Sequence, residues 1–182
     1  DDYLAAMMAE YAVYGVLHFH RDMHTYRQEQ LASHWNRGWP LYTPETAVGI
    51  LGLGAIGGDC AAKLGAMGFQ VHGWSRRPKS LAGVTCHHGP DGLLEMAGQC
   101  RYLVCVLPLT PQTQGIINKD LINAMPRGGF IVNIARGGHQ VDEDLLAALD
   151  SGQLGGIFLD VFNAEPLPAE HPYWQHNKVW MT

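Results

Sequence analysis

The strongest constraint on folding is the turn Gly52–Gly57, of sequence GLGAIG, which directly follows the apolar segment Ala47–Leu51. The segment after the turn is predicted to form a helix. Between a strand and a helix, Gly52 permits a tight turn, Gly54 lets a pyrophosphate approach the backbone, and Gly57 allows close helix packing. Free N–H groups at the helix start favour a bound phosphate. Glycine-rich turns are common in α/β proteins, so it is the flanking elements that predict a dinucleotide site.

Beyond this turn, short apolar segments alternate with helical stretches, the pattern of a parallel sheet covered on both faces. We therefore expect an α/β fold, a doubly wound parallel sheet of the Rossmann type. The predicted strands are Ala47–Leu51, Gln70–Trp74, Tyr102–Leu107, Phe130–Ile134, Gly156–Asp160 and Val179–Met181. The predicted helices are Ile56–Met67, Gly92–Ala97, Lys119–Met125 and Asp142–Ser151.

The segment before the first strand is predicted to be one long helix, from Leu4 to about His34, because apolar residues recur at helical spacing and no proline interrupts them. Its second half is polar, so only the first half is expected to bury a wide face. Trp39-Pro40 and Thr43-Pro44 then mark a connector. We divide the chain into an interdomain or dimerisation helix with its connector, residues 1–40, and a nucleotide-binding domain, residues 41–182.

The long helix leads to two further expectations. Its apolar face would lack cover in a monomer, so we expect a homodimer through Met7, Met8, Tyr11 and Tyr14. His20 and His24 lie four residues apart and could bind a metal, but no third ligand is evident. We expect them to lie on a solvated face, and we expect no metal site. The adjacent pair His87-His88 is predicted to lie in a loop.

Composition narrows the class of protein. A hydrophobic content of 47% is enough to bury the core of one main domain, and a formal net charge of -5 argues against a nucleic-acid or anionic membrane surface. No apolar run reaches the roughly 18 residues needed to span a bilayer. C-x-x-C spacing is absent, so reduced thiols and a cytoplasmic location are expected for Cys60, Cys86, Cys100 and Cys105.

The end of the second predicted strand bears on the choice of cofactor. NAD-specific domains usually carry an acidic residue there, about 20 residues after the glycine turn, to hold the ribose hydroxyls. This chain has Ser75, Arg76 and Arg77 instead. Two guanidiniums and a hydroxyl suit a 2′-phosphate, although a solvated basic loop is the alternative. We expect NADP(H) to be preferred, with NAD(H) possible.

Three further motifs follow predicted strands: LPLTPQT at 107–113, NIARGG at 133–138 and LDVFNAEPL at 159–167. Together with the glycine turn they resemble the D-isomer-specific 2-hydroxyacid dehydrogenases over essentially the whole chain. Within that family, WSRR at 74–77 and HPYWQH at 171–176 are most similar to the glyoxylate/hydroxypyruvate reductase A branch, whose members favour NADPH.

The resemblance implies roles for three residues. Arg136 would hold the carboxylate and carbonyl oxygen of a 2-keto acid, a task that suits its fork of donors, whereas a structural salt bridge is the alternative. Glu165 would pair with a catalytic histidine and raise its pKa, although alone it would be assigned to a surface loop. Asp160 would contact the nicotinamide end, or could simply cap the following turn. The catalytic candidates are therefore Arg136 and Glu165.

The complete set of expected cofactor-binding residues is Gly52, Gly54, Ala55, Ile56, Gly57, Ser75, Arg76, Arg77, Leu107, Pro108, Thr113, Ile134, Ala135, Arg136 and Asp160. In the family, the catalytic histidine follows a proline shortly after the last strand, and none of the ten histidines here matches that pattern. We expect this histidine beyond Thr182, and the substrate domain outside this chain. The 182 residues alone should then bind nucleotide and catalyse little.

The resulting hypothesis is an NADPH-dependent reduction of glyoxylate, hydroxypyruvate or a related 2-keto acid to the 2-hydroxy acid. The alternative is a dinucleotide-sensing interaction protein, similar to a corepressor, without physiological turnover. An S-adenosylmethionine methyltransferase ranks last, because it usually needs an acid after the second strand, where this chain has Ser75-Arg76-Arg77.

Overall fold

Seven short strands pair side by side in the computed structural model, which describes residues 2–182. They form one sheet in the order β3-β2-β1-β4-β5-β6-β7, and every neighbouring pair is parallel. The direction of winding reverses between β1 and β4, which places a topological switch point there. The strands are β1 Ala47–Leu51, β2 Gln70–Ser75, β3 Thr85–His88, β4 Tyr102–Cys105, β5 Gly129–Asn133, β6 Leu154–Leu159 and β7 Val179–Met181.

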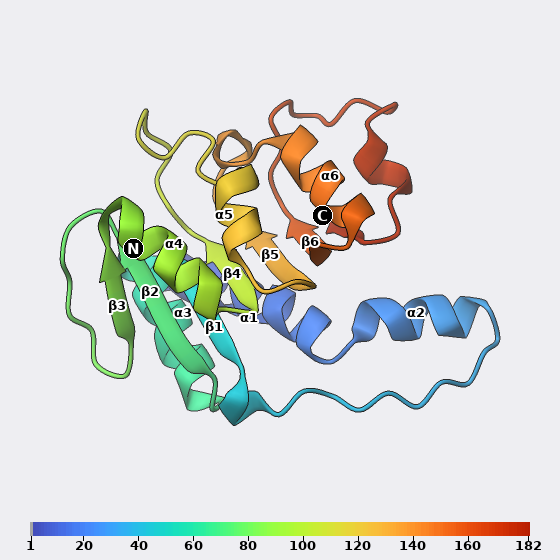
Figure 1. Cartoon of the computed structure of the whole chain (residues 1–182), viewed down its shortest axis with the longest axis horizontal. Coiled ribbons are helices and arrows are strands. Elements are labelled where there is room, and N and C mark those ends of the chain that lie inside the picture. Colours follow the sequence, from blue (N-terminus) through green and yellow to red (C-terminus); the bar gives the residue numbers. More distant parts are fainter. Residues whose placement is uncertain (1) are drawn as a thin grey trace.

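Helices cover both faces of the sheet (Figure 1). α1 and α3 pack on one face, while α4, α5 and α6 pack on the other. The helices are α1 Asp2–His20, α2 Met23–Leu31, α3 Ala55–Ala66, α4 Gly89–Gln99, α5 Lys119–Ala124 and α6 Asp142–Ser151. Short 3-10 helices are Thr43–Glu45, Gly137–His139 and Pro172–Gln175. The predicted doubly wound α/β fold is confirmed.

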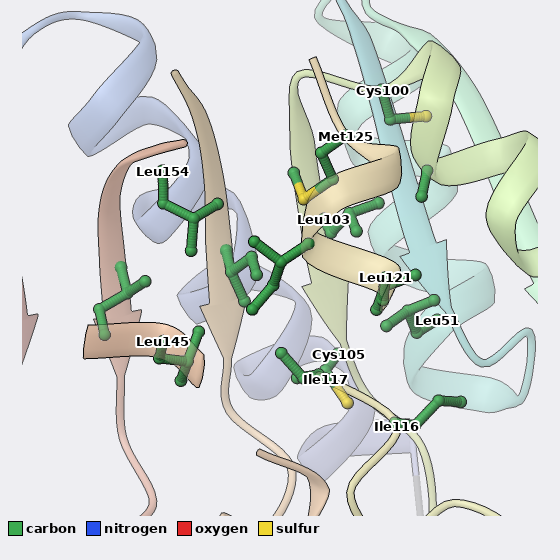
Figure 2. Close-up of a cluster of buried hydrophobic side chains, with 14 of the residues drawn as sticks. Leu51, Cys100, Leu103, Cys105, Ile116, Ile117, Leu121, Met125, Leu145 and Leu154 are labelled. Carbon is green, nitrogen blue, oxygen red and sulfur yellow. The ribbon is translucent and has the colours of Figure 1, made fainter. Parts of the chain in front are cut away.

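The two cores are built from alternate residues of the same strands, as expected for a parallel sheet buried on both faces. On β4, Leu103 and Cys105 face the core beneath α4, α5 and α6, which Figure 2 shows, whereas Tyr102 and Val104 face α1 and α3. Each of these four side chains is fully buried. The strand is therefore held on both sides, which fixes the sheet edge that carries the site.

The prediction of one long N-terminal helix was wrong. The helix breaks after His20, where Asp22 takes a left-handed backbone conformation with φ 57°, and resumes as the separate α2. α2 buries no residue, and Figure 1 shows it projecting from the body of the molecule. The buried face of α1 also differs from the one predicted, because Met7 and Tyr14 are about half exposed while small residues face the sheet. At Gly15, an added Cβ would lie 2.9 Å from Val132, so only a narrow residue fits.

Two expectations for histidines were also wrong. His20 is not on a solvated face: it is buried, and its ring nitrogens contact the Tyr102 hydroxyl at 3.2 Å and the Thr43 hydroxyl at 3.0 Å. His87 and His88 lie in β3 rather than in a loop. Successive side chains of a strand alternate between faces, so His87 is buried while His88 is exposed.

Within residues 2–182, no helix combines the length and the hydropathy needed to cross a membrane. The same residues contain no group of three or more histidine, cysteine or acidic side chains placed to hold a metal ion. All four cysteines are free thiols.

Candidate functional site

The glycine turn joins β1 to α3 in a conformation that only glycine allows at two positions. Gly52 has φ 106°, a region that other residues rarely adopt, and an added Cβ at Gly57 would lie 1.8 Å from the Gly52 carbonyl oxygen. At Gly54, by contrast, a Cβ would meet no protein atom within 4 Å. Gly54 is also the N-cap of α3 and provides no capping side chain. The first N–H groups of α3 therefore face an open space suited to an anion.

A cleft of about 670 Å³ opens beside this turn, at the carboxyl ends of β1, β2 and β4. Its walls come from the glycine turn, from the segment after β2, from the start of α4 and from the loop after β4. Most of the lining is apolar, including Leu53, Pro90, Leu93 and Ile116. Ligands of open α/β sheets bind at such an edge, next to the topological switch point. The cleft thus has the place and the chemistry of a nucleotide site.

The basic segment after β2 reaches the cleft unequally. All three basic side chains are exposed, but only Arg76 and Lys79 line the cleft, and Arg77 does not. Ser75 also lines the cleft, but its hydroxyl donates to the carbonyl of Arg77 at 2.7 Å and so stabilises the turn. Lys79 Nζ donates to the carbonyl of Leu53 at 2.7 Å. Sequence reasoning left Lys79 out of the site, although it stood in the same basic run.

The loop after β4 forms the opposite wall of the cleft. The strand ends at Cys105, earlier than predicted, so Leu107 and Pro108 lie in the loop itself. Thr113 Oγ1 donates to the Pro108 carbonyl at 2.7 Å and accepts from Thr110 N–H at 2.9 Å. Its hydroxyl is therefore engaged in shaping the loop.

A second cavity of about 650 Å³ adjoins the first, and the residues 106–108 line both. The loop after β5 contributes Ile134, Ala135 and Arg136 to its lining. β5 itself ends at Asn133, one residue before the predicted boundary. Ile56 lines it from the start of α3. The side chain of Arg136 is exposed, so its guanidinium is accessible to an anion.

The segment after β6 packs directly against the Arg136 turn. A Cβ on Gly137 would lie 2.0 Å from the carbonyl carbon of Phe162, so the two backbones touch there. Phe162 N–H donates to Glu165 Oε1 at 2.9 Å, which holds the exposed Glu165 on this neighbouring loop. In residues 2–182, Glu165 makes no hydrogen bond or ion pair with a histidine. Arg136 and Glu165 thus lie on adjoining loops at the carboxyl edge of the sheet.

Asp160 follows β6 at the same edge, just beyond the strand that was predicted to include it. Its N–H donates to the Asn133 carbonyl at 3.1 Å, and its Oδ1 accepts from the Thr182 hydroxyl at 2.9 Å. Thr182 also contacts the hydroxyl of Tyr11 on α1. Burial raises the pKa of Tyr11, and the negative charge of Asp160 adds to that rise. Thr182, directly after β7, thus links the Asp160 carboxylate to Tyr11 on α1.

Comparisons with known proteins agree with this arrangement. A family model described as the NAD binding domain of D-isomer specific 2-hydroxyacid dehydrogenases matches residues 13–182. The chain belongs to this family, which confirms the resemblance inferred from its motifs.

Solved structures of related proteins extend the comparison. A D-isomer specific 2-hydroxyacid dehydrogenase from Xanthobacter autotrophicus Py2, in complex with NADPH and MES, is 40% identical with a TM-score of 0.97, over 100% of this chain and 75% of that one. A family protein from Klebsiella pneumoniae 342 is 43% identical with a TM-score of 0.97, and the match covers 100% of this chain and 58% of that one. An NADPH-dependent glyoxylate/hydroxypyruvate reductase from Sinorhizobium meliloti, in complex with NADP and sulfate, is 38% identical with a TM-score of 0.95, over 100% of this chain and 59% of that one. This chain therefore spans little more than half of the last two relatives.

Proposed function

We propose that this NAD(P)-binding domain serves an NADPH-dependent reductase that converts glyoxylate, hydroxypyruvate or a related 2-keto acid into the 2-hydroxy acid. The observation that carries the proposal is the adjacency of two cavities, one beside the glycine turn and one lined by Arg136. A cofactor in the first and a keto acid in the second would meet at their shared wall, residues 106–108. The relatives from X. autotrophicus and S. meliloti, with NADPH and NADP in their structures, support this cofactor.

The residues of the cleft fit a dinucleotide phosphate. The open space at Gly54 and the free N–H groups of α3 would hold the pyrophosphate. Arg76 and Lys79 would pair with the 2′-phosphate, and β2 ends in Ser75 rather than in a carboxylate that would repel it. NAD(H) lacks that phosphate and would bind more weakly. The proposal also retains the other expected contacts, Gly52, Ala55, Ile56, Gly57, Leu107, Pro108, Thr113, Ile134, Ala135 and Asp160. Arg136 lines the second cavity and is assigned to the substrate instead, and Arg77 is left out because it does not line the cleft.

The chemistry would divide between the cofactor and the side chains of the second cavity. When bound, the nicotinamide supplies the hydride that reduces the keto carbon. Arg136 would grip the substrate carboxylate and carbonyl oxygen with its fork of N–H donors, which orients the carbonyl and stabilises the charge that develops on its oxygen. Glu165 would hold a histidine in its protonated form, so that the histidine can deliver a proton to that oxygen. Apolar lining from Ile56 and Leu109 would limit water.

The activity is tested on the full-length protein by following NADPH consumption with glyoxylate and hydroxypyruvate. Arg136→Ala should lower kcat/KM on the order of 10²-fold or more, the usual cost of removing an oxyanion donor, while the NADPH Kd stays unchanged. Arg127→Ala is the matched control, because Arg127 is exposed and donates to the Ser151 carbonyl away from both cavities. If the wild-type protein binds NADPH but turns over no 2-keto acid, the sensing alternative replaces this proposal.

The cofactor preference is tested separately by fluorescence titration with NADPH and NADH. Arg76→Ala removes a charge-assisted contact, so the NADPH Kd should rise about tenfold or more while the NADH Kd changes little. Arg77→Ala is the matched control, because Arg77 does not line the cleft. Equal effects of both substitutions would contradict the assignment of Arg76 to the 2′-phosphate.

We also propose that the chain forms a homodimer, with residues 1–40 serving the interface and 41–182 the nucleotide. α2 has nine residues and buries none of them, whereas helices of this length are marginal in water without packing. The segment after α2 carries large apolar side chains that are exposed to solvent, notably Trp35, 92% exposed, and Trp39, 84% exposed. Replacing both tryptophans by glutamate should convert a dimeric mass into a monomeric one in light scattering. A monomeric wild-type protein at micromolar concentration would refute this.

We also propose that the protein is cytoplasmic, a location that its four free thiols support. Cell fractionation tests it.

A further inference from the structure

A fully buried amide side chain lies directly beneath the Arg136 turn. Asn133, 0% exposed at the end of β5, accepts from Ala135 N–H through Oδ1 at 3.1 Å. Its Nδ2 donates to the Arg136 carbonyl at 3.1 Å and to Gln140 Oε1 at 2.8 Å. Both ends of the amide are thus satisfied inside the protein, which holds it in one orientation.

The carbonyl oxygen of Arg136 collects three donors. Besides Asn133 Nδ2, it accepts from the N–H of His139 at 3.2 Å and lies 3.1 Å from His139 Nδ1. A carbonyl can only accept, so this contact requires the proton on Nδ1. The guanidinium itself is exposed and donates to the Ala135 carbonyl. The direction in which Arg136 leaves the backbone is therefore set from the buried side of the turn.

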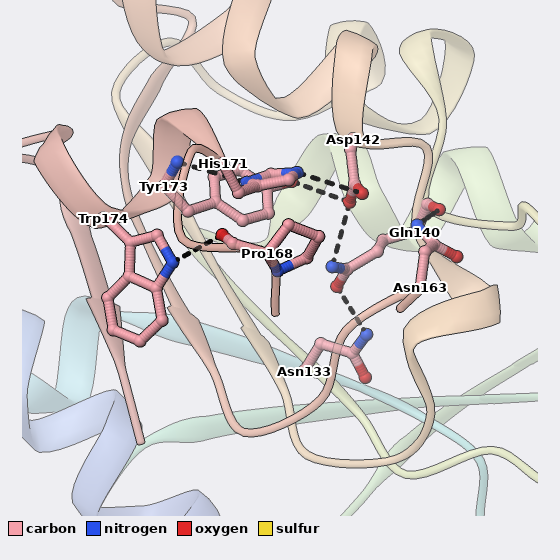
Figure 3. Close-up of polar contacts among 8 residues, drawn as sticks. All are labelled: Asn133, Gln140, Asp142, Asn163, Pro168, His171, Tyr173 and Trp174. Carbon is pink, nitrogen blue, oxygen red and sulfur yellow. Dashed lines mark hydrogen bonds and ion pairs between the residues drawn. The ribbon is translucent and has the colours of Figure 1, made fainter. Parts of the chain in front are cut away.

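Gln140 joins this turn to the segment that bears Glu165. It is 3% exposed, and its Nε2 donates to Asp142 Oδ1 at 3.1 Å while its Oε1 accepts from Asn133. Its main-chain carbonyl accepts from Asn163 Nδ2 at 3.2 Å. Figure 3 shows the resulting chain of side chains, from Asn133 through Gln140 to Asp142.

The far end of the chain is fixed as well. Asp142 Oδ1 accepts from the Tyr173 hydroxyl at 2.8 Å, and Asp142 Oδ2 lies 3.8 Å from His171 Nε2 (Figure 3). Tyr173 is 1% exposed, so this anchor cannot turn freely. The segment after β6 is thereby held against the Arg136 turn at both of its ends, near Asn163 and at Tyr173.

We propose that Gln140 is a positioning residue for the Arg136–Glu165 pair. The inference rests on the proposed function, because it gives these two residues their tasks. Gln140 makes no hydrogen bond with either of their side chains; it acts through Asn133 on one side and through Asp142 and Asn163 on the other. Each end of its side-chain amide serves a different neighbour, so the residue couples two loops that carry different parts of the reaction.

Replacing Gln140 by leucine would keep the volume and remove both amide contacts. Asn133 would lose one of its two acceptors, and Asp142 would lose one donor. The Arg136 turn would then be free to shift, and a misplacement of about 1 Å commonly costs on the order of 10²-fold in rate. The cleft beside the glycine turn does not include Gln140, so cofactor binding should be unaffected.

The experiment compares Gln140→Leu with Gln153→Leu in the full-length protein. Gln153 also makes two amide contacts, donating to the Ile122 and Met125 carbonyls at 3.0 and 2.9 Å, but it precedes β6 at the opposite edge of the sheet. We expect Gln140→Leu to lower kcat/KM for the 2-keto acid on the order of 10²-fold, with an unchanged NADPH Kd. Gln153→Leu should lower Tm and leave both kinetic and binding constants unchanged.

Gln140→Glu provides a readout that a merely structural role would not move. The protonated carboxyl can donate to Asp142 and accept from Asn133, as the amide does, whereas the ionised form faces the Asp142 carboxylate and repels it. The ratio of its kcat/KM to that of the wild type should therefore rise as the pH falls, while the ratio for Gln140→Leu stays flat.

The outcomes separate the two proposals. An active wild-type enzyme in which Gln140→Leu behaves like Gln153→Leu would overturn the positioning role and leave the proposed function standing. A wild-type enzyme that reduces no 2-keto acid would overturn both. If Gln140→Leu does not fold, the pH ratio of Gln140→Glu decides, and a flat ratio overturns the inference.

Discussion

Gly57 offers a sharp test of the glycine turn, because an added methyl group has a defined clash. The ideal Cβ of Gly57→Ala would lie 1.8 Å from the Gly52 carbonyl oxygen, whereas real Cβ contacts are essentially never under 3.0 Å. The start of α3 and the turn must therefore separate by about 1 Å, which would weaken the hydrogen bonds from the α3 N–H groups to the pyrophosphate. Losing one hydrogen bond to a charged group costs about 1.5–3 kcal/mol, so we expect the NADPH Kd to rise on the order of 10- to 100-fold.

The neighbouring Gly58 is the matched control. It lies in the same turn of α3, and a Cβ there would meet nothing within 4 Å. Gly58→Ala should gain about 0.5–1 kcal/mol from the better helix propensity of alanine, with an unchanged NADPH Kd. Gly57→Ala gains the same propensity but suffers overpacking, which typically costs about 1–3 kcal/mol.

Thermal unfolding and fluorescence titration of both variants measure these effects. At about 2–4 °C per kcal/mol for a protein of this size, Gly58→Ala should raise Tm slightly and Gly57→Ala should lower it by a few degrees. If Gly57→Ala bound NADPH as tightly as Gly58→Ala, the contact between α3 and the turn would not be needed for the site, and this reasoning would be refuted.

Three further predictions concern stability and reactivity. Tyr173→Phe removes a hydrogen bond to the Asp142 carboxylate, so unfolding in urea should show a loss of about 1.5–3 kcal/mol, and an unchanged midpoint would contradict the contact. Burial, with a smaller effect from His24, lowers the pKa of His18 from 6.5 to about 4, so the folded state keeps this ring neutral while the unfolded chain takes up a proton. Stability should therefore be full above pH 6.5 and fall as the pH drops towards 4, and His18→Leu should flatten that dependence in urea titrations across the range. Burial raises the pKa of three cysteines to about 12, so maleimide should label Cys86 first in the native protein, and mass spectrometry showing uniform labelling would disprove this.

Local patterns were enough to predict most of the fold. Apolar runs and helical periodicity report what a segment can bury, and they placed β1, β7 and α6 at their observed bounds. The glycine turn could also be predicted, because the positive φ of Gly52 and the close contact at Gly57 leave no room for a side chain. Strands, helices and turns of this kind depend mainly on residues adjacent in the sequence, so they can be predicted from the sequence alone.

The errors fall where distant contacts decide. The helical pattern runs on past His20, but α1 ends there, and Asp22 tolerates the left-handed conformation that ends it. β3 became a strand because β2 offers it a partner, with Trp74 opposite His87. The sequence predicted a surface position for His20, but folding places the Tyr102 and Thr43 hydroxyls against its ring.

The candidate site divides in the same way. The sequence alone determined which residue types stand after each strand, and hence that Arg76, Arg136 and Glu165 gather at one edge of the sheet, because parallel strands end together. Only the tertiary structure decided that Arg76 lines the cleft while Arg77 does not, and that the buried Gln140 ties the Arg136 turn to the loop of Glu165. The positions of strands and turns along the chain follow from local patterns, whereas side-chain direction and buried hydrogen bonds depend on what the folded chain packs against each residue.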